Sequence, residues 1–487
     1  MPAHRKLFVI SDLHLGGQSA VPGQRGFRLC TQEAQLAQFI DALTALADPV
    51  IELVINGDLV DFLAEETGDP DEKWSPFHYP ESKAVDRLAA IVRRSAIVFD
   101  ALKRFLAAPR HRLVILPGNH DVELNLPAVR RALREAVGAN GAADYEFIAH
   151  GEAYRAGDVL IEHGNRVDDM NFVDYHSLRH LCGLLSRGMA VMPQFRFNPP
   201  AGSKLVAEIM NPIKEHYGFI DLLKPEAEAA FPVLLALEPG RRADLARLAA
   251  ALAIGKLRRV EQDWSAASNI SARPAAAQPA AAAPEISPED ALGDLLERTV
   301  GRRDFGRPPR PSEAGSGSAQ NISLGSAARS LWALLRAPES QEWPARLPDL
   351  LEALRKAQSP SAFDRQHESA TEYWDEAKAL GRGPVRHVVF GHTHLAKQVN
   401  LPGSGRGCYF NSGTWADILE LPRSILEENH RQLLPLAELE TFVRDLVAQD
   451  FSRYTTFRPT FVRVEQDVAG QSVRADLCDY SAGAPVE

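Results

Sequence analysis

Apolar residues along the chain follow two alternating patterns. Short apolar or β-branched runs, typical of buried strands, occupy residues 7–10, 50–55, 113–116 and 159–161. Longer segments with helical periodicity lie between them, as at 33–47 and 82–107. Strands that alternate with helices predict βαβ units around a parallel or mixed sheet, and therefore the α/β fold class. A turn at Ala156-Gly157-Asp158 also predicts a hairpin over 153–161.

The middle of the chain has a different pattern. Its apolar spacing is mostly helical, with expected helices at 172–185, 204–223, 241–263, 327–336, 345–357 and 368–380. Ala, Pro, Gly and Ser dominate about 266–325, and such a composition buries too little apolar surface to offset the entropy of ordering, which predicts a flexible segment. Strand patterns return at 385–390, 407–411 and 460–465. We therefore expect three parts: the first part of a core at 1–165, a helical insertion or cap at 166–383, and the second part of the core with a C-terminal extension at 384–487.

Composition narrows the class of protein. The 487 residues are 45% hydrophobic and 24% charged, which is typical of a soluble globular chain. The formal net charge of -10 argues against broad binding to a nucleic-acid backbone, and we find no strong nucleic-acid signal. The four cysteines are far apart and form no zinc-finger or disulfide pattern, so we expect a cytoplasmic protein. No run of about 20 apolar residues predicts a transmembrane segment.

Polar motifs follow five of the predicted strands. They are Ser11-Asp12-Leu13-His14, Gly57-Asp58-Leu59-Val60-Asp61, Gly118-Asn119-His120-Asp121, His163-Gly164-Asn165 and Gly391-His392-Thr393-His394. Open α/β sheets bind ligands at the carboxyl ends of their strands, so one fold would bring all five motifs to one rim. Each motif alone is common in surface loops and turns. Their occurrence together, in order, at five strand ends predicts a site.

The residue types in these motifs suit divalent cations. Carboxylate, imidazole and amide oxygen together fit Mn, Fe, Zn or Co better than a thiolate site would. In an extended segment, alternation turns Asp12 and His14 to one side, and the same argument pairs His392 with His394. One carboxylate shared by two cations, here Asp58, would hold them about 3.5–4 Å apart.

The motif order D-x-H, G-D-x-x-D, G-N-H-D, H-G and G-H-x-H resembles that of the calcineurin-like metallophosphoesterases. The resemblance covers roughly residues 5–165 and 384–418. It implies a four-layer αββα sandwich with a dinuclear metal centre, to which this chain adds a large helical insertion.

The resemblance also implies roles for particular residues. It places the first metal on Asp12, His14, Asp58 and His394. It places the second metal on Asp58, Asn119, His163 and His392. His120 matches the catalytic histidine of the family, and Asp121 matches its partner. His150-Gly151 is a second H-G pair, but we prefer His163 because a predicted strand leads directly into it.

The implied activity is hydrolysis of phosphoesters by a metal-activated hydroxide. Two divalent metal ions, most readily Mn, Fe or Zn, would polarise the phosphoryl oxygens and lower the pKa of a shared water. Ser-Asp-Leu-His-Leu and His-Gly are also distantly similar to the UDP-diacylglucosamine pyrophosphatases, which typically carry Arg in place of His120. We expect a phosphatase or phosphodiesterase acting on a small-molecule or lipid-linked phosphoester. The alternatives are a nucleotide-lipid pyrophosphatase, a nuclease and a non-catalytic metal-binding scaffold.

Some residues outside the five motifs are also candidates for function. Arg25, Arg28 and Arg166 follow the motifs and could bind substrate phosphate through charge-assisted hydrogen bonds. His176 and His180 lie one turn apart on an expected helix, where we interpret them as packing residues rather than metal ligands. Residues 189–197 mix Met, Phe and Arg, and we interpret them as core rather than as a lipid-facing surface.

Overall fold

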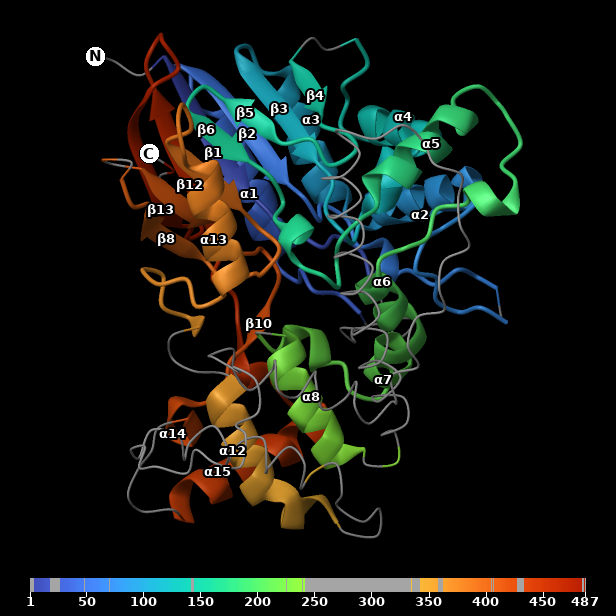
Figure 1. Ribbon diagram of the computed structural model, residues 1–487, viewed down its shortest axis with the longest axis vertical. Helices are drawn as coiled ribbons and strands as arrows, with labels where there is room; N and C mark the ends of the chain where they lie inside the picture. The colour runs from blue at the N-terminus through green and yellow to red at the C-terminus, as the bar shows by residue number, and fades with distance from the viewer. Residues whose placement is uncertain are drawn as a thin grey trace, which may run out of the picture. The chain divides into compact units, whose positions relative to one another are not determined.

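The structure is a computed structural model whose chain divides into two compact units (Figure 1). It describes residues 4–17, 27–47, 49–69, 71–141, 144–224, 226–238, 240, 334, 342–357, 362–403, 405, 407–426, 433–483 and 486. Unit 1 comprises Met1–Lys224, Pro360–Glu420 and Ser452–Glu487. Unit 2 comprises Pro225–Ser359 and Leu421–Phe451. The expected flexible segment at 266–325 and the expected helix at 241–263 lie outside the described residues, as does 327–336 apart from Leu334.

Unit 1 contains a six-stranded mixed sheet with the order β13-β12-β1-β2-β3-β4. Its strands are β1 (Arg5–Ile10), β2 (Val50–Asn56), β3 (His111–Leu116), β4 (Tyr145–Phe147), β12 (Thr460–Gln466) and β13 (Ser472–Asp479). The first four strands are parallel, while β12 pairs antiparallel with β1 and β13 pairs antiparallel with β12. The parallel strands therefore end at one edge of the sheet.

A second sheet of five strands has the order β5-β6-β7-β9-β8. Its strands are β5 (Tyr154–Ala156), β6 (Val159–Ile161), β7 (His387–Phe390), β8 (Lys397–Asn400) and β9 (Cys408–Asn411). The expected hairpin is present, because β5 pairs antiparallel with β6. The strands β6, β7 and β9 are parallel, so residues on either side of the long middle segment of the chain become neighbours in this sheet.

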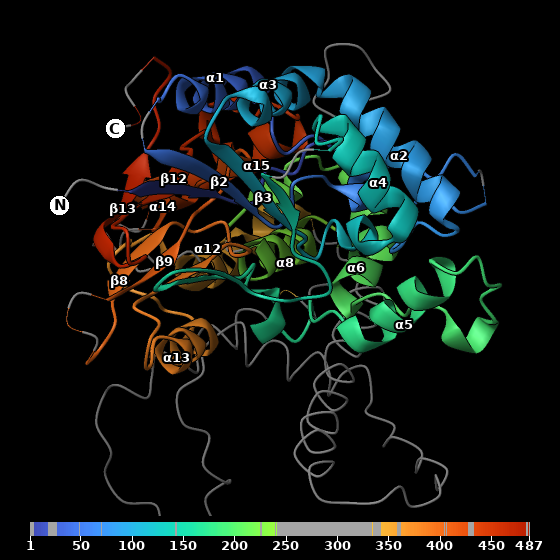
Figure 2. The same cartoon turned by 90° about the horizontal axis from the view of Figure 1, so that it is seen from above.

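Helices cover the outer faces of the two sheets. Next to the first sheet lie α1 (Glu33–Thr44), α2 (Glu81–Arg94), α3 (Ala96–Ala107) and α4 (Pro127–Ala136), and next to the second lies α13 (Thr371–Leu380). Figure 2 shows α1 and α3 on one side of the strands and α13 on the other. The segment expected as one helix at 82–107 is two helices, because the chain breaks at Ser95, which has a ψ of 29°.

Alternation along the strands explains the layers. In β1, Leu7 and Val9 belong to the apolar core between the two sheets, together with Val389 of β7. Phe8 and Ile10, which point the other way, belong to the core under α1 and α3. These layers confirm the four-layer αββα sandwich of the α/β class.

Unit 1 also contains elements outside the two sheets and the helices that cover them. They are α5 (Tyr175–Leu185), α6 (Ala201–Leu205), α7 (Asn211–Lys214) and the two-stranded pair of β10 (Ile418–Leu419) and β11 (Thr455–Thr456). The helix expected at 204–223 is shorter than predicted: α6, a π-helical turn at Val206–Met210 and α7 follow one another with helical backbone angles and end at Lys214.

Unit 2 is helical in its described part. It contains α8 (Glu226–Leu237), α12 (Leu347–Ala357), α14 (Arg423–Leu426) and α15 (Leu433–Val447). Side chains such as Leu350, Leu354 and Phe442 are fully buried among these helices. The side chain of Arg346 also donates a hydrogen bond of 2.7 Å to the carbonyl of Ala236. Within the part of the chain that the structure describes, no helix is long and apolar enough to cross a membrane.

Candidate metal centre

The five polar motifs meet where β1, β2, β3, β6 and β7 end. Potential ligand atoms form three groups, each with all its atoms within 4.8 Å of one another: Asp12, His14 and His394; His14, Asp58 and His120; Asp58, His163 and His392. His14 and Asp58 each belong to two groups, so the groups form one continuous cluster. The structure thus brings together six of the seven predicted ligands as potential donors, and Asn119 stands beside His120 at the end of β3.

The backbone at the predicted ligands is unusual. Positive φ angles of 45–69° occur at Asp12, His14, Asp58, His392 and His394. Residues with side chains rarely adopt this region, and each such residue costs on the order of 1–3 kcal/mol. Strain of this kind is found mainly at functional sites.

The expectation that Asp12 and His14 share a side through an extended backbone is wrong. Their positive φ angles curl the chain around the end of β2. The backbone N–H groups of Leu13 and His14 both donate to the carbonyl of Asp58, at 2.9 Å. The convergence of Asp12 and His14 therefore comes from a loop that is shaped by its neighbouring strand.

His14 is arranged as a metal ligand would be. Its Nδ1 lies 3.2 Å from Oδ2 of Asp61, while its Nε2 lies 3.0 Å from Nε2 of His394 and 3.7 Å from Asp58. A carboxylate on one ring nitrogen sets the tautomer and leaves the other nitrogen as a donor to a metal. His394 Nε2 also lies 3.4 Å from Oδ1 of Asp12.

His163 repeats this arrangement on the other side of Asp58. Its Nδ1 lies 2.8 Å from the carbonyl oxygen of Asn56, and its Nε2 lies 3.2 Å from Oδ2 of Asp58. That buried Nε2 has no hydrogen-bond partner among the described residues. A Cβ at Gly118 would collide with Asp58 and lie 2.7 Å from His163 Nε2, so only glycine allows this close approach.

Several buried polar atoms of the cluster have no hydrogen-bond partner in the part of the chain that the structure describes. Besides His163 Nε2, they are Oδ1 of Asn119 and Nδ1 of His394. An orphaned buried polar atom costs roughly 1–3 kcal/mol, and buried polar atoms in proteins are rarely left so. Because amide oxygen, imidazole nitrogen and carboxylate are all suitable donors, the residues present fit divalent cations.

The charges of the cluster oppose one another. Burial and the charge of Asp58 raise the pKa of Asp12. Burial acts in the same direction on Asp58, but His163 and His120 outweigh it and hold the pKa of Asp58 below its usual range. For His163, burial is outweighed by Asp58, and the pKa rises to about 9. The cluster therefore depends on neighbouring positive charge, which imidazolium rings or bound cations can supply.

The Asp61 carboxylate is a side-chain partner of His120. Nδ1 of His120 lies 3.1 Å from Oδ1 of Asp61, and the backbone N–H of His120 donates to Asp58 Oδ1 at 2.9 Å. The family resemblance implies that Asp121 is the partner of His120. In the structure the Asp121 carboxylate instead accepts hydrogen bonds from the backbone N–H groups of Gly118, at 2.6 Å, and Leu59, at 2.8 Å. Asp121 thus ties the loop after β3 to the loop after β2.

A second carboxylate that sequence reasoning missed is Asp168. Its Oδ2 lies 2.9 Å from Nε2 of His392, and its other contacts are with the side-chain amide of Asn171 and the backbone N–H of Met170. Asp168 lies in none of the five motifs, so the sequence gives no signal for it. Asp61 lies in the G-D-x-x-D motif, which was a signal that it could contact a histidine of the site. His150 belongs to none of the three ligand groups found among the described residues.

Two of the three predicted substrate-binding arginines form ion pairs in the structure. Arg166 forms ion pairs with Glu162, at 3.2 Å, and with Glu376. Arg28 lies 3.3 Å from Glu33. Arg25 lies outside the described residues. The ion pairs of Arg166 and Arg28 engage both guanidinium groups with carboxylates of the chain itself.

Comparison with known proteins defines the class. Residues 5–202 match the family model of the calcineurin-like phosphoesterases. The chain therefore contains a calcineurin-like phosphoesterase domain, which confirms the metallophosphoesterase superfamily that the motifs indicated. The family and the Asp and His groups together support a metal-dependent phosphoesterase. No curated protein matches the chain.

Proposed function

We propose that this protein is a dinuclear metal-dependent phosphoester hydrolase. The observation that carries the proposal is that two imidazole rings are each held in a fixed orientation by a contact at Nδ1. Nδ1 of His14 and Nδ1 of His163 each lie against an oxygen atom. The Nε2 atoms of both rings therefore face Asp58, and the two histidines belong to different ligand groups that share Asp58. An acidic side chain between two such donors suits a carboxylate that is shared by two cations.

The proposed ligands follow from this arrangement. The first cation would be held by Asp12, His14, Asp58 and His394. The second would be held by Asp58, Asn119, His163 and His392. When bound, the two cations would supply Lewis-acid stabilisation of a phosphoryl group and an activated water for in-line attack. The orphaned Asn119 Oδ1 and His163 Nε2 support the second set.

His120 is the proposed catalytic residue. Its imidazole is partly exposed, at 22% of the side chain, whereas those of His14 and His163 are buried. Asp61 faces Nδ1 of this ring at 3.1 Å and so orients the imidazole at the edge of the cluster. A positioned histidine of this kind can stabilise phosphoryl oxygens or protonate the leaving oxygen, which contributes typically about 10²–10⁴-fold to a rate.

A substrate panel with elemental analysis tests the proposal. We expect the purified full-length chain to hydrolyse p-nitrophenyl phosphate or its bis ester with Mn²⁺, and to contain bound metal. Chelation or Asp58→Ala should abolish hydrolysis, because Asp58 belongs to two ligand groups. His150→Ala is the matched control, since it removes the H-G histidine that stands outside those groups.

The outcomes separate the alternatives. Hydrolysis that survives both chelation and Asp58→Ala refutes a metal-dependent mechanism. Bound metal without turnover of any phosphomonoester, phosphodiester or pyrophosphate in the panel refutes an enzyme and indicates a metal-binding scaffold. The panel should include single-stranded DNA and RNA, because cleavage of these alone would indicate a nuclease.

A further inference from the structure

Exposed hydrophobic side chains gather in one short segment of unit 1. Seven large hydrophobic residues are exposed in the described part of the chain, and three of them lie within seven residues of sequence. These three are Met189, Met192 and Phe195, which are 52%, 53% and 37% exposed. The expectation that 189–197 is core is therefore wrong for them, although Phe197 is buried. Apolar side chains grouped on a surface commonly mark an interaction site.

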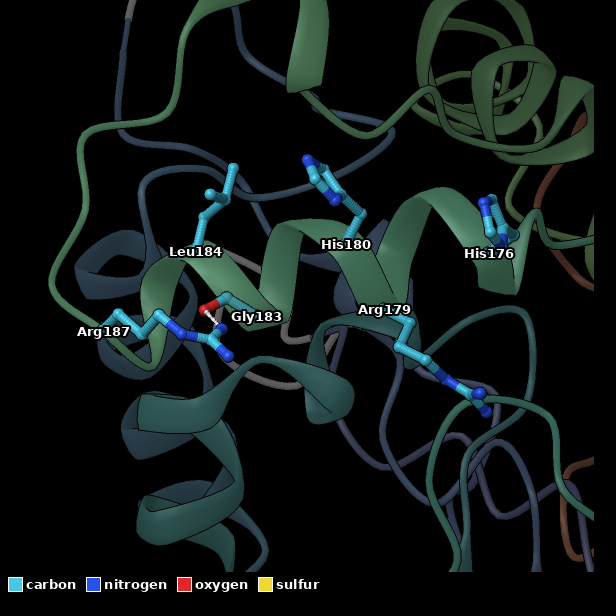
Figure 3. A pocket seen from close by; sticks show the side chains of 6 residues that line it. All are labelled: His176, Arg179, His180, Gly183, Leu184 and Arg187. Carbon is cyan, nitrogen blue, oxygen red and sulfur yellow. Dashed lines mark hydrogen bonds between the residues drawn. The ribbon is translucent and has the colours of Figure 1, made fainter. Parts of the chain in front are cut away.

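The helix before this segment has one buried and one polar face. Leu178, Leu181 and Cys182 of α5 are buried in the core of unit 1. The side chains of His176, His180 and Leu184 project from one side of α5, and Arg179 and Arg187 project from another (Figure 3). The expectation that His176 and His180 pack inside the fold is also wrong, because both are exposed.

The charge of this region contrasts with that of the chain. Residues 175–207 contain three arginines and one lysine but no Asp or Glu, although the whole chain has 64 acidic residues and a net charge of -10. Arg179 pairs with Glu152 at 3.3 Å. Arg187 instead donates to the carbonyl of Gly183, and Arg196 lies over the ring of Tyr79. No carboxylate among the described residues pairs with Arg187 or Arg196.

The region lies at the periphery of its unit. In both Figure 1 and Figure 2, α5 and the loop that follows it lie at the edge of unit 1, beyond the strands and beside α4. We use the term basic apolar surface for the side chains of Arg187, Met189, Met192, Phe195 and Arg196. All five are exposed.

We propose that the basic apolar surface docks onto an anionic phospholipid bilayer. Met and Phe side chains can enter the interface between headgroups and acyl chains, while arginines beside them attract the negative lipid charge. Exposed Met and Phe side chains next to arginines, in a stretch of 33 residues without Asp or Glu, are complementary to a surface that is both apolar and anionic, and a bilayer of anionic phospholipids is such a surface. The proposal does not depend on the phosphoesterase activity.

Vesicle flotation of the full-length chain tests this inference. We expect binding to vesicles that contain phosphatidylglycerol and much weaker binding to pure phosphatidylcholine, and high salt should weaken the former. The triple variant Met189→Ser, Met192→Ser, Phe195→Ser should lower the partition coefficient about tenfold or more. Arg187→Gln and Arg196→Gln should each lower it about fivefold, since a basic residue near an anionic surface contributes about 1 kcal/mol.

Matched controls keep the test decisive. Ile97→Ser and Val468→Ser remove exposed hydrophobic side chains elsewhere and should leave binding unchanged. The triple variant should retain the hydrolysis of soluble p-nitrophenyl phosphate, because none of its residues belongs to the ligand groups. Equal binding to both kinds of vesicle, no binding, or full binding by the triple variant overturns the proposal. A concentration-dependent dimer that the triple variant abolishes, without lipid binding by the wild type, also overturns it and indicates self-association.

Discussion

Replacing Asp61 with asparagine would separate metal binding from the chemical step. The Asp61 carboxylate faces two imidazoles: Oδ2 lies 3.2 Å from His14 Nδ1, and Oδ1 lies 3.1 Å from His120 Nδ1. Oδ1 also accepts the backbone N–H of Ala64 at 3.2 Å. Burial alone would raise the pKa of Asp61, but His120 and His14 outweigh it and hold the pKa well below its usual range. Asp61 is therefore ionised at neutral pH.

The expected loss of metal affinity in Asp61→Asn follows from the different contacts of the two carboxylate oxygens of Asp61. Asparagine has one oxygen, and the N–H of Ala64 holds that oxygen at the Oδ1 position, where it still faces His120. The amide NH₂ then faces His14 and cannot accept a hydrogen bond from it. Loss of a hydrogen bond to a charged group costs about 1.5–3 kcal/mol. We therefore expect metal affinity to fall about 10–150-fold, while kcat at saturating metal falls less than about tenfold.

Metal titration by calorimetry, together with kcat at saturating metal, measures both quantities. Asp61→Ala should lower both, because it removes both oxygens from the imidazoles. Asp100→Asn is a suitable control, since this exposed carboxylate pairs only with Lys103 in the described structure. Metal affinity of Asp61→Asn within threefold of the wild type would refute the reasoning.

Three further predictions concern the loops, the metals and a buried acid. Gly118→Ala should weaken metal binding about tenfold or more in a metal titration, because its Cβ collides with Asp58 and His163; wild-type affinity would contradict this. Chelation should lower the melting temperature roughly 5–10 °C in scanning calorimetry, since a metal at one hundred times its Kd contributes about 2.7 kcal/mol; an unchanged melting temperature speaks against bound metal. Burial raises the pKa of Glu123 to about 8, so the wild type should lose up to a few kcal/mol of stability as pH rises from 4.5 to 8. Glu123→Gln keeps an acceptor for the N–H of His78 and should not show this loss. If denaturant titrations give the same difference in free energy of unfolding between wild type and Glu123→Gln at every pH, the raised pKa of Glu123 is refuted.

The predicted fold agrees with the structure where apolar alternation was strong. The strands β1, β2, β3, β6, β7, β9 and β12 all lie within two residues of the expected runs. The strands β4, β8 and β13 had no such signal, because each lies at the edge of a sheet and carries partly exposed side chains. Edge strands need only one bonded neighbour and one covered face, so a sequence pattern of burial does not reveal them.

The candidate site also has a part that the sequence predicts and a part that it does not. Residue types and their position after strands were sufficient to predict Asp12, His14, Asp58, His163, His392 and His394 as donors that meet at one rim. Their backbone conformation was not predictable, because the positive φ angles depend on hydrogen bonds to a neighbouring loop. The exposure of Met189 and Met192 was also not predictable, because a mixture of apolar and basic residues does not show which side chains pack against the rest of the fold.

The sequence by itself determined the α/β class, the order of the motifs and the chemistry of the donors, because these depend on local periodicity and on residue type. Only the tertiary structure decided which side chains act on one another. Asp61 contacts His120 across 59 positions of sequence, and Asp168 contacts His392 across 224. Such pairs are set by the register of strands and the path of loops, which no local pattern encodes.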